Sequence, residues 1–315
     1  MAQPSVDVIV PAKDVGDKIR PALEAVRAQT YPLLGSVVVA ASDSGTADAA
    51  RACGAVVVDN PSGRTPTGLN LALARTTAEV IARVDAHSVI PPGYLDRAVQ
   101  ILIDTGADVV GGMQVPVGRT AWEKAIATAM SSRLGAGDAR YRIGGKPGRA
   151  DTVYLGVFRK ATLERLGGYD EHFDRNQDYE LNQRIRDSGG IVWFDPGLEV
   201  AYRPRGSLAG LARQYFDYGR WKREFARRHP GTLRPRQLAP PLLVAGLTLS
   251  IIAGLWWPWA WLAVGAYLLV LMLFGLSRLG SIGPGALLIP PALAAMHWSW
   301  GLGFLLGRLS QGRTL

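Results

Sequence analysis

Asp14, Asp43 and Asp85 each follow a short apolar run of the sequence. Short apolar runs that end in turn residues are typical of buried strands. In an open α/β sheet, ligands bind beyond the carboxyl ends of the strands, so three carboxylates at such ends predict one polar ligand or cation site. The alternative for each aspartate alone is that it caps the following helix.

The elements that must position these carboxylates alternate between strand and helix. Apolar runs predict strands over Val6–Val10, Ser36–Ala41, Ala55–Val58 and Val80–Val84, and a further strand from Asp108. Helical periodicity predicts helices over Asp17–Gln29, Thr46–Cys53, Thr67–Thr76 and Tyr94–Thr105. This alternation predicts βαβ units and a mostly parallel sheet, so we expect an α/β fold with a Rossmann-like arrangement.

The pattern weakens after Gly118. We expect a helix over Trp122–Leu134, a mobile basic loop over Arg140–Arg149, a helix over Asp178–Arg186 and a strand over Ile191–Phe194.

The excess of basic residues in the chain is concentrated in one short window. Nine arginines and Lys222 lie between Arg203 and Arg236 against Asp217 and Glu224, so this window carries most of the net charge of +9. A basic cluster just before an apolar segment indicates a cytoplasmic patch that faces anionic lipid, and the near-neutral remainder argues against a nucleic-acid partner. The window contains an amphipathic pattern over Ser207–Arg228 that predicts an interfacial helix, or alternatively an ordinary surface helix.

Three apolar segments follow, and Arg278 is the only charged side chain between Leu238 and Gly307. Each approaches the roughly 20 residues that cross a bilayer, so we predict three transmembrane helices, over Pro240–Trp257, Trp259–Leu276 and Gly285–Leu306. The prolines Pro290 and Pro291 leave a re-entrant form open for the third. His297 in that segment is either a packed polar residue or part of a site.

These patterns divide the chain into residues 1–204, an α/β domain; residues 205–237, the basic interfacial region; and residues 238–315, the membrane domain. The start of the chain shows no secretory signal pattern, so we expect the first domain to remain in the cytoplasm. The single cysteine, Cys53, excludes an intrachain disulfide and fits a reducing compartment. The alternation of basic and apolar segments predicts a multi-pass protein of the inner (plasma) membrane, with membrane lipids as partners.

Three stretches near these strands carry a family resemblance. Val8–Asp14, Asp43–Asp48 and Gly63–Asn70 resemble the nucleotide-contacting segments of the family 2 glycosyltransferases of the GT-A fold, in the branch that includes succinoglycan-biosynthesis glucosyltransferases. The resemblance extends from about Val6 to Pro204. It implies a GT-A-type sheet, with Asp43 at the nucleotide base and Arg64 at the phosphates. The donor-binding residues that it implies are Pro11, Ala12, Asp14, Asp43, Arg64, Asn70 and Asp85.

Asp85-Ala86-His87 occupies the place of the Asp-X-Asp metal motif of that family. As residues alone the triplet is a weak signal, because a helix cap and a surface histidine explain such a triplet more often than a metal site does. The resemblance implies that Asp85 and His87 bind a divalent cation, Mn²⁺ or Mg²⁺. Histidine in the last position favours Mn²⁺, since Mg²⁺ prefers oxygen ligands.

Asn176–Leu181 resembles the Glu-Asp pair that precedes a helix in the family, with Gln177 in the glutamate position. The resemblance implies that Asp178 is the general base. An aspartate carboxylate is ionised at neutral pH and can accept a proton from an attacking hydroxyl. A single base suits one-step inversion at the sugar carbon. Asp178 can cap the following helix at the same time.

The resemblance thus implies an inverting hexosyltransferase of cell-envelope or exopolysaccharide biosynthesis. Its donor would be a nucleotide sugar such as UDP-glucose or another UDP-hexose, and its acceptor a lipid-linked glycan or other glycolipid at the membrane. Two alternatives stay open on the residues: a nucleotidyltransferase on a similar sheet, and an inactive membrane scaffold that retains a transferase fold.

Overall fold

The computed structural model describes residues 3–307 and contains two compact units. The sheet unit comprises the described residues of Met1–Val115 and Gly144–Tyr202, and the helical unit comprises those of Pro116–Ile143 and Arg203–Leu315. Residues 116–143, which the sequence analysis placed in the first domain, therefore pack with the C-terminal helices. Arg308 and Arg313 lie outside the described residues.

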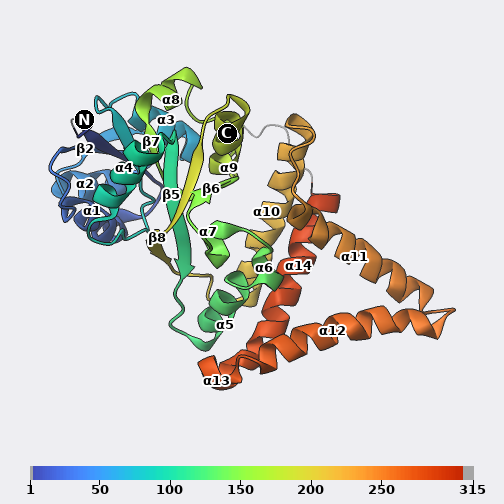
Figure 1. Ribbon diagram of the computed structural model, residues 1–315. Helices are drawn as coiled ribbons and strands as arrows, with labels where there is room; N and C mark the ends of the chain where they lie inside the picture. Colours follow the sequence, from blue (N-terminus) through green and yellow to red (C-terminus); the bar gives the residue numbers. More distant parts are fainter. Residues whose placement is uncertain (1–2, 308–315) are drawn as a thin grey trace. The chain divides into compact units, whose positions relative to one another are not determined.

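The sheet unit contains one mixed sheet of eight strands with the order β3-β2-β1-β4-β7-β5-β8-β6 (Figure 1). Its strands are β1 (Val6–Ala12), β2 (Leu34–Ala41), β3 (Val56–Asp59), β4 (Val80–Arg83), β5 (Val109–Pro116), β6 (Gly148–Arg149), β7 (Tyr154–Arg159) and β8 (Val192–Tyr202). Its helices are η1 (Gly16–Ile19), α1 (Arg20–Arg27), α2 (Ser44–Ala52), α3 (Thr65–Leu73), α4 (Tyr94–Thr105), α8 (Lys160–Arg165) and α9 (Gln177–Asp187).

Alternate residues of β1 face two separate cores. Val8 and Val10 pack with the apolar sides of α1, α2 and α4, whereas Ile9 packs with α3, α8 and α9 on the other face. This is the period-two pattern of a strand that is covered on both sides, and it explains the continuous apolar run. β1, β2, β3 and β4 are parallel neighbours, as the βαβ alternation predicts.

Two strands after Gly118, β6 and β7, were not predicted from the sequence, and both form antiparallel pairs. β7 lies between β4 and β5 and runs antiparallel to both. The expected loop over Arg140–Arg149 instead contains α7 (Arg140–Ile143) and β6, which pairs with β8. Arg142 is 8% exposed, whereas the other basic side chains of this stretch, Arg140, Lys146 and Arg149, are exposed.

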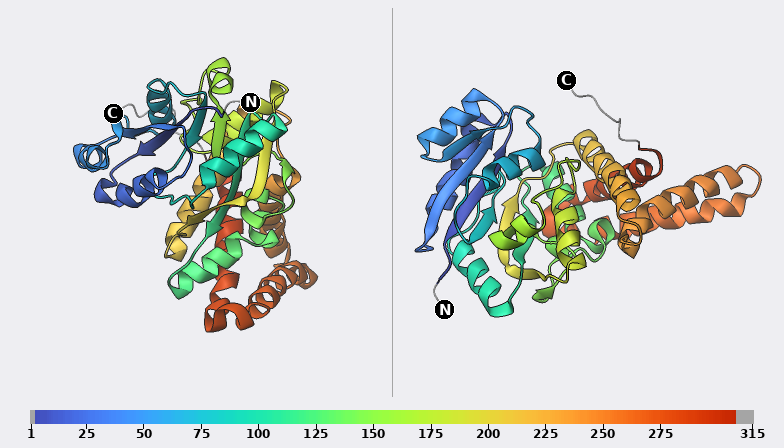
Figure 2. Two further views of the ribbon diagram at one scale, coloured as in Figure 1. Left: turned by 60° about the vertical axis from the view of Figure 1, so that its left-hand side comes forward. Right: turned by 90° about the horizontal axis from the view of Figure 1, so that it is seen from above.

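Apart from Pro116, the last residue of β5, the helical unit contains no strand among its described residues. Its α-helices are α5 (Ala121–Met130), α6 (Arg133–Ala136), α7, α10 (Leu208–Arg228), α11 (Pro235–Ala253), α12 (Trp261–Leu276), α13 (Leu279–Ile282) and α14 (Ile289–Leu306), and its 3₁₀ helices are η2 (Pro258–Ala260) and η3 (Gly283–Leu288). α10 packs along α14, and α11 and α12 are joined by a tight turn at one end (Figure 2), from which they diverge (Figure 1).

Three helical segments are long and apolar enough to cross a membrane: Pro235–Ala253, Pro258–Leu276 and Leu279–Leu306. Many of their large apolar side chains are exposed; Leu242 is 68% exposed and Leu262 is 64% exposed. An exposed apolar surface of this extent fits contact with lipid. Pro290 falls in the first turn of α14, where a proline begins a helix without losing a backbone hydrogen bond, so the prolines do not interrupt it.

Glycines allow α10 and α14 to approach closely. A Cβ atom at Gly219 of α10 would overlap the carbonyl oxygen of Trp300, and one at Gly303 of α14 would overlap that of Phe216. Small residues at such contacts are typical of helices that associate in membranes. The apolar side of α10 is therefore covered by α14, and the proposed location of this helix at a membrane interface stays a prediction.

His297 of α14 is a packed polar residue. Its Nε2 lies 2.8 Å from the carbonyl oxygen of Leu134, and its Nδ1 lies 3.2 Å from the hydroxyl of Tyr267.

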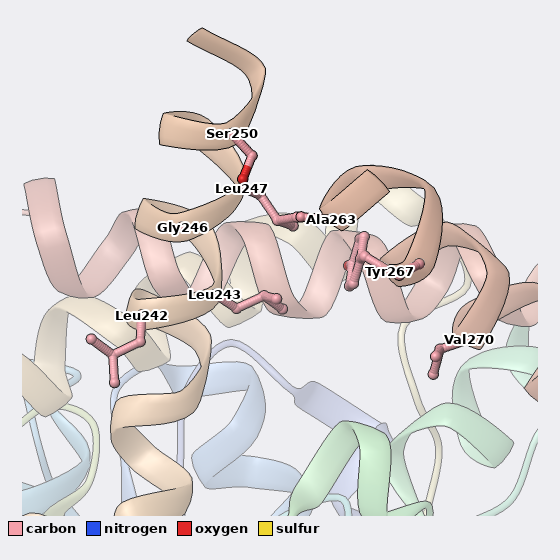
Figure 3. Close-up of a pocket in the computed structure, with 9 residues that line it drawn as sticks. Leu242, Leu243, Gly246, Leu247, Ser250, Ala263, Tyr267 and Val270 are labelled. Atoms are coloured by element: carbon pink, nitrogen blue, oxygen red, sulfur yellow. The ribbon is translucent and has the colours of Figure 1, made fainter. Parts of the chain in front are cut away.

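A pocket of about 530 Å³ lies between α11 and α12 (Figure 3). Its lining is apolar except for the hydroxyl groups of Ser250 and Tyr267. No charged side chain lines it, so it offers no chemistry for binding a diphosphate.

Candidate active site

The carboxyl ends of three adjacent strands bring Asp14, Asp43 and Asp85 to one edge of the sheet. In the register of the sheet, Ala12 of β1 is opposite Ala41 of β2, and Ile9 of β1 is opposite Arg83 of β4. Each aspartate follows its strand by two residues, so all three lie at the edge where open α/β sheets bind ligands. Pro11 and Ala12 form the end of β1 at this same edge.

Asp43 is held by the start of α2. Its Oδ1 accepts the N–H of Thr46 at 2.8 Å as the N-cap of the helix, and its Oδ2 accepts the N–H of Asp14 at 3.0 Å. The hydrogen bonds from Thr46, followed by the one from Asp14, lower the pKa of Asp43. Capping therefore keeps this carboxylate ionised and connects the ends of β1 and β2.

Asp14 has a backbone φ of 50°, in the left-handed region that is uncommon for residues with a side chain. Backbone strain of this kind tends to gather at functional sites, where the surrounding structure maintains it.

Arg83 joins Asp85 to Asp178. Its Nε and Nη2 donate to Oδ1 of Asp85 at 3.0 and 2.8 Å, and its Nη1 donates to Oδ1 of Asp178. The Arg83 side chain is 5% exposed, whereas the two carboxylates are 33% and 36% exposed. Burial acts to lower the pKa of Arg83, but the charge of Asp85 and other neighbours outweigh it and the pKa is raised. The guanidinium is therefore a permanent buried charge between two carboxylates.

The bonds of Arg83 use one oxygen of each carboxylate. In the described part of the chain, nothing bonds to Oδ2 of Asp85 or to Oδ2 of Asp178. Each carboxylate thus has one oxygen that is bonded to Arg83 and a second oxygen without a protein partner among the described residues.

The sharp turn at Asn176 positions Asp178. Asn176 has φ 64° and precedes α9, so Asp178 lies in the first turn of this helix. A carboxylate in this position is stabilised by the positive end of the helix dipole. The Nδ2 of Asn176 and the hydroxyl of Tyr169 are buried polar atoms without a hydrogen-bond partner in the described structure. Such atoms are costly unless a ligand or water satisfies them.

Asp85 and His87 carry donor atoms that divalent metal ions accept. The Asp85 side chain is 33% exposed with its Oδ2 free of a protein partner in the described structure, and His87 is exposed two residues further along the chain. Among residues 3–307, no group of three or more histidine, cysteine, aspartate or glutamate side chains is arranged to hold a metal ion. The two residues therefore fit a cation that takes its remaining ligands from the oxygens of a bound diphosphate and from water.

Arg64 and Asn70 contact the loop that leads to Asp178. Arg64 forms an ion pair with Asp174 at 2.8 Å and donates to the carbonyl of Glu171 at 2.5 Å. Asn70 donates through Nδ2 to the carbonyl of Tyr169 at 2.9 Å and accepts the Tyr169 N–H at 2.8 Å through Oδ1. Their predicted contacts with a donor stay predictions, and both side chains position the loop before α9.

Sequence reasoning missed Arg83, although the sequence holds a signal for it. Arg83 ends an apolar strand that is buried along its whole length, and arginine is almost never fully buried unless it is paired. An arginine in such a strand therefore predicts a carboxylate partner nearby. Which carboxylates are its partners depends on the fold, because Asp178 lies 95 residues further along the chain.

Comparisons with known proteins agree with this architecture. The model of the glycosyl transferase family 2 matches residues 7–167, which is more than half of the chain. The chain is 30% identical over 310 residues to the succinoglycan biosynthesis protein ExoA of Rhizobium meliloti, covering 94% of this chain and 93% of that protein. It is 25% identical over 230 residues to the glycosyltransferase AglE of Haloferax volcanii, covering 69% of this chain and 72% of the relative.

Among solved structures, the mannosyltransferase PcManGT of Pyrobaculum calidifontis, in complex with GDP-Man and Mn²⁺, has a TM-score of 0.63 with this chain. The identity is 23%, and the match covers 95% of this chain and 88% of that one. At this identity the likeness shows a shared fold. Together with the family model and the 30% identical relative, the comparisons favour glycosyl transfer over the nucleotidyltransferase alternative, and they place this chain in glycosyl transferase family 2, as a glycosyltransferase.

Proposed function

We propose that this protein is an inverting, membrane-bound glycosyltransferase of polysaccharide biosynthesis, which transfers a hexose from a nucleoside diphosphate donor to a lipid-linked glycan acceptor. The observation that carries the proposal is the triad in which Arg83 joins Asp85 and Asp178 at the carboxyl edge of the sheet. The relationship to the succinoglycan biosynthesis protein ExoA supports polysaccharide biosynthesis as the process.

In the proposed reaction, Asp178 acts as the general base. A hydroxyl of the acceptor attacks the anomeric carbon of the donor sugar, the bond from that carbon to the diphosphate oxygen breaks, and the proton of the hydroxyl passes to Oδ2 of Asp178. The nucleoside diphosphate leaves with the bonding electrons. Arg83 holds Oδ1, so the carboxylate presents its other oxygen in one orientation.

On the donor side, Asp43 is the proposed contact for the nucleotide base, at the edge it shares with Asp14, Pro11 and Ala12. UDP-glucose or another UDP-hexose is the proposed donor. Asp85 and His87 would hold a divalent cation, Mn²⁺ or Mg²⁺, which when bound would neutralise the departing diphosphate. Arg83 bonds to Oδ1 of Asp85, so Oδ2 is the oxygen that would bind the cation.

The proposed location is the inner (plasma) membrane, with the sheet unit in the cytoplasm. The three apolar helical segments support a multi-pass anchor, and the basic residues before the first segment support a cytoplasmic start. The chain passes between the sheet unit and the helical unit three times, so the sheet unit is covalently fixed to the membrane helices at several points. An acceptor carried on a lipid suits an enzyme anchored in this way.

The variant Asp178→Asn tests the base. We expect it to fold normally and to bind the donor with an affinity close to that of the wild type, while transfer falls by about 100-fold or more, because an amide cannot accept the proton. Transfer would be measured as released nucleoside diphosphate, in detergent-solubilised full-length protein, over a panel of nucleotide sugars with Mn²⁺ and with Mg²⁺.

Asp187→Asn is the matched control, since Asp187 is also a carboxylate of α9 but lies at the opposite end of the helix. It should transfer sugar at the wild-type rate. Undiminished transfer by Asp178→Asn would refute the base assignment, and absence of transfer by the wild type with every nucleotide sugar would refute the proposed function itself.

A further inference from the structure

The turn that carries Asp85 and His87 is bonded to a tyrosine of another strand. Ser88, the next residue, is 3% exposed, and its backbone N–H donates to the carbonyl of Asp85 at 2.8 Å. The hydroxyl groups of Ser88 and Tyr154 lie 3.0 Å apart and share a hydrogen bond. Tyr154 is the first residue of β7, so this bond connects the proposed cation-binding turn to the middle of the sheet.

The sheet contains a bulge beside Tyr154. Val110 of β5 is opposite Val157 of β7. Two residues further along β5, Gly112 is opposite Tyr154, which lies three residues before Val157. Over this stretch β7 therefore has one residue more than β5, which is the definition of a β-bulge. Bulges are over-represented next to active sites, where they change the direction in which a side chain points.

The bulge determines which face of the sheet Tyr154 meets. Val157 and Phe158 lie in opposite cores, as alternation along a strand requires, so an uninterrupted strand would place Tyr154 on the side of Phe158. Tyr154 instead packs with the core that contains Val157 and Ala86. Ala86 is the middle residue of the Asp85–His87 turn. The extra residue of β7 therefore places this tyrosine on the same face as the turn.

Two contacts maintain the unusual backbone of the bulge. Leu155 has φ 45°, which is an outlier for a bulky side chain, and its carbonyl accepts a hydrogen bond from the hydroxyl of Tyr94 at 3.0 Å. On the other side, a Cβ atom at Gly111 would lie 2.6 Å from the carbonyl oxygen of Tyr154, so only glycine allows β5 to approach this closely. Strained backbone that its surroundings maintain is typical of functional sites.

The Tyr154 phenol is suited to position the turn as a neutral group. Burial, followed by the charge of Asp85, raises the pKa of Tyr154 to about 12. The hydroxyl therefore stays protonated at neutral pH and forms a hydrogen bond with Ser88 rather than acting as a charged ligand of the cation.

We propose that Tyr154 is a positioning residue of the cation site, which through Ser88 fixes the turn that presents Asp85 and His87. This inference rests on the proposed function, because it concerns the cation that would neutralise the departing diphosphate. Groups that orient the ligands of a metal ion typically contribute about 10- to 100-fold to the affinity for the metal. The hydroxyl of Tyr154 should have an effect of this size without touching the cation.

Tyr154→Phe tests the proposal, since it removes only the hydroxyl. Binding of Mn²⁺ to the detergent-solubilised full-length protein would be measured from the paramagnetic resonance signal of free Mn²⁺, with UDP and in parallel with GDP. We expect the variant to bind Mn²⁺ about 10- to 100-fold more weakly than the wild type. An unchanged affinity for Mn²⁺ would overturn the proposal.

Tyr31→Phe is the matched control, because it also removes a bonded phenol hydroxyl from the sheet unit. The hydroxyl of Tyr31 donates to the carbonyl of Pro4 at 2.6 Å, just before β1 begins and thus at the opposite edge of the sheet. This variant should lose unfolding temperature to an extent similar to that of Tyr154→Phe and keep the wild-type affinity for Mn²⁺. Equally weakened Mn²⁺ binding in both variants would indicate a general loss of stability and contradict a positioning role.

Ser88→Ala removes the same hydrogen bond from its other partner. It should weaken Mn²⁺ binding as much as Tyr154→Phe does, and the double variant should bind no more weakly than either single variant, because all three lack one and the same bond. Effects that multiply in the double variant would show that the two hydroxyls act separately, and the route through Ser88 would then be wrong.

Kinetics separate metal binding from chemistry. Tyr154→Phe should raise KM for Mn²⁺ and leave kcat at saturating Mn²⁺ nearly unchanged. A lower kcat with an unchanged KM for Mn²⁺ would contradict the proposal. Binding of Mn²⁺ needs no turnover, so a wild type that binds Mn²⁺ but transfers no sugar would refute the proposed function and leave the binding result standing. A wild type that does not bind Mn²⁺ would overturn the cation site and this inference with it.

Discussion

The guanidinium of Arg83 bonds to two carboxylates with different proposed roles: Asp85 in cation binding and Asp178 as the general base. Without its charge, Asp85 and Asp178 would repel each other across the site. With it, each carboxylate is fixed through one oxygen and offers the other. Arg83 would thus act through its neighbours rather than on the substrate.

We expect Arg83→Gln to reduce transfer by about 10- to 100-fold, since the carboxylates lose their common anchor and small displacements of catalytic groups have effects of this size. The variant should also lose about 1–3 kcal/mol of unfolding free energy, because charged hydrogen bonds are removed from a buried position. Initial rates and thermal unfolding of the solubilised protein would measure both. A rate equal to that of the wild type would show that the triad is not used in transfer.

Asp43 is the N-cap of α2 and also the proposed contact for the nucleotide base, and two substitutions separate these roles. Asparagine is also a good N-cap but has one acceptor oxygen in place of two, so Asp43→Asn should lower the unfolding temperature less than Asp43→Ala does and should weaken donor binding by about tenfold. Asp43→Ala should lose both. Donor affinity, measured by calorimetry, and unfolding temperature give the two readings. An unchanged donor affinity in Asp43→Asn would show that Asp43 does not contact the donor.

The lowered pKa of Asp43 adds a test by pH. Because the folded-state pKa lies below the ordinary value of an aspartate, the cap contributes its full stability above about pH 4, and this is lost as the pH falls through the lowered value. The difference in unfolding temperature between the wild type and Asp43→Ala should therefore shrink in acid. A difference that stays constant from pH 7 to pH 3 would contradict the role of the ionised cap.

At this scale, the sequence indicates which strand ends bear carboxylates, since apolar runs followed by aspartate are local patterns. It does not reveal that Arg83 joins Asp85 to Asp178, because that contact requires β4 and α9 to meet after folding. Nor does it reveal that Arg142 is buried, since a basic, glycine-rich stretch resembles a solvated loop.

Among the elements, the four parallel strands and the starts of β5 and β8 were predictable from the sequence, whereas β6 and β7 were not. β1, β2, β3 and β4 repeat a βαβ unit, so each strand is followed by a helix at regular spacing. β7 is joined to no such unit, and its position between β4 and β5 depends on pairing across long sequence separations. Alternation along the chain cannot specify such pairing.

The contact between α10 and α14 depends on glycine, and a matched pair of substitutions tests it. Gly303→Ala should destabilise the protein by about 1–3 kcal/mol, because a methyl group would meet the backbone of Phe216. Gly246→Ala on α11 meets nothing within 4 Å and should be neutral, or stabilising through the better helix propensity of alanine. Thermal unfolding in one detergent would compare the two. Equal behaviour of both variants would show that close approach of these helices is not required.

For the whole molecule, the single cysteine makes the membrane topology directly testable. In a Cys53→Ala background, Trp257→Cys labels the turn between α11 and α12, and Ser281→Cys labels the segment before α14. The basic window predicts that the first site faces outward and the second faces the cytoplasm. An impermeant maleimide should therefore modify Trp257→Cys in intact cells, and Ser281→Cys only after permeabilisation. The reverse labelling would invert the proposed topology.

The helical unit incorporates residues 116–143 from the middle of the chain, and this has a consequence for biosynthesis. α5 leaves the ribosome long before α14, against which it packs in the finished protein. During translation the buried side of α5, with Ala125, Ile126 and Met130, lacks its contact with α14 until the end of the chain has been synthesised. A nascent chain arrested before α14 would thus lack one of the helices that cover α5, and the helical unit could be completed only once the last apolar helix has been synthesised.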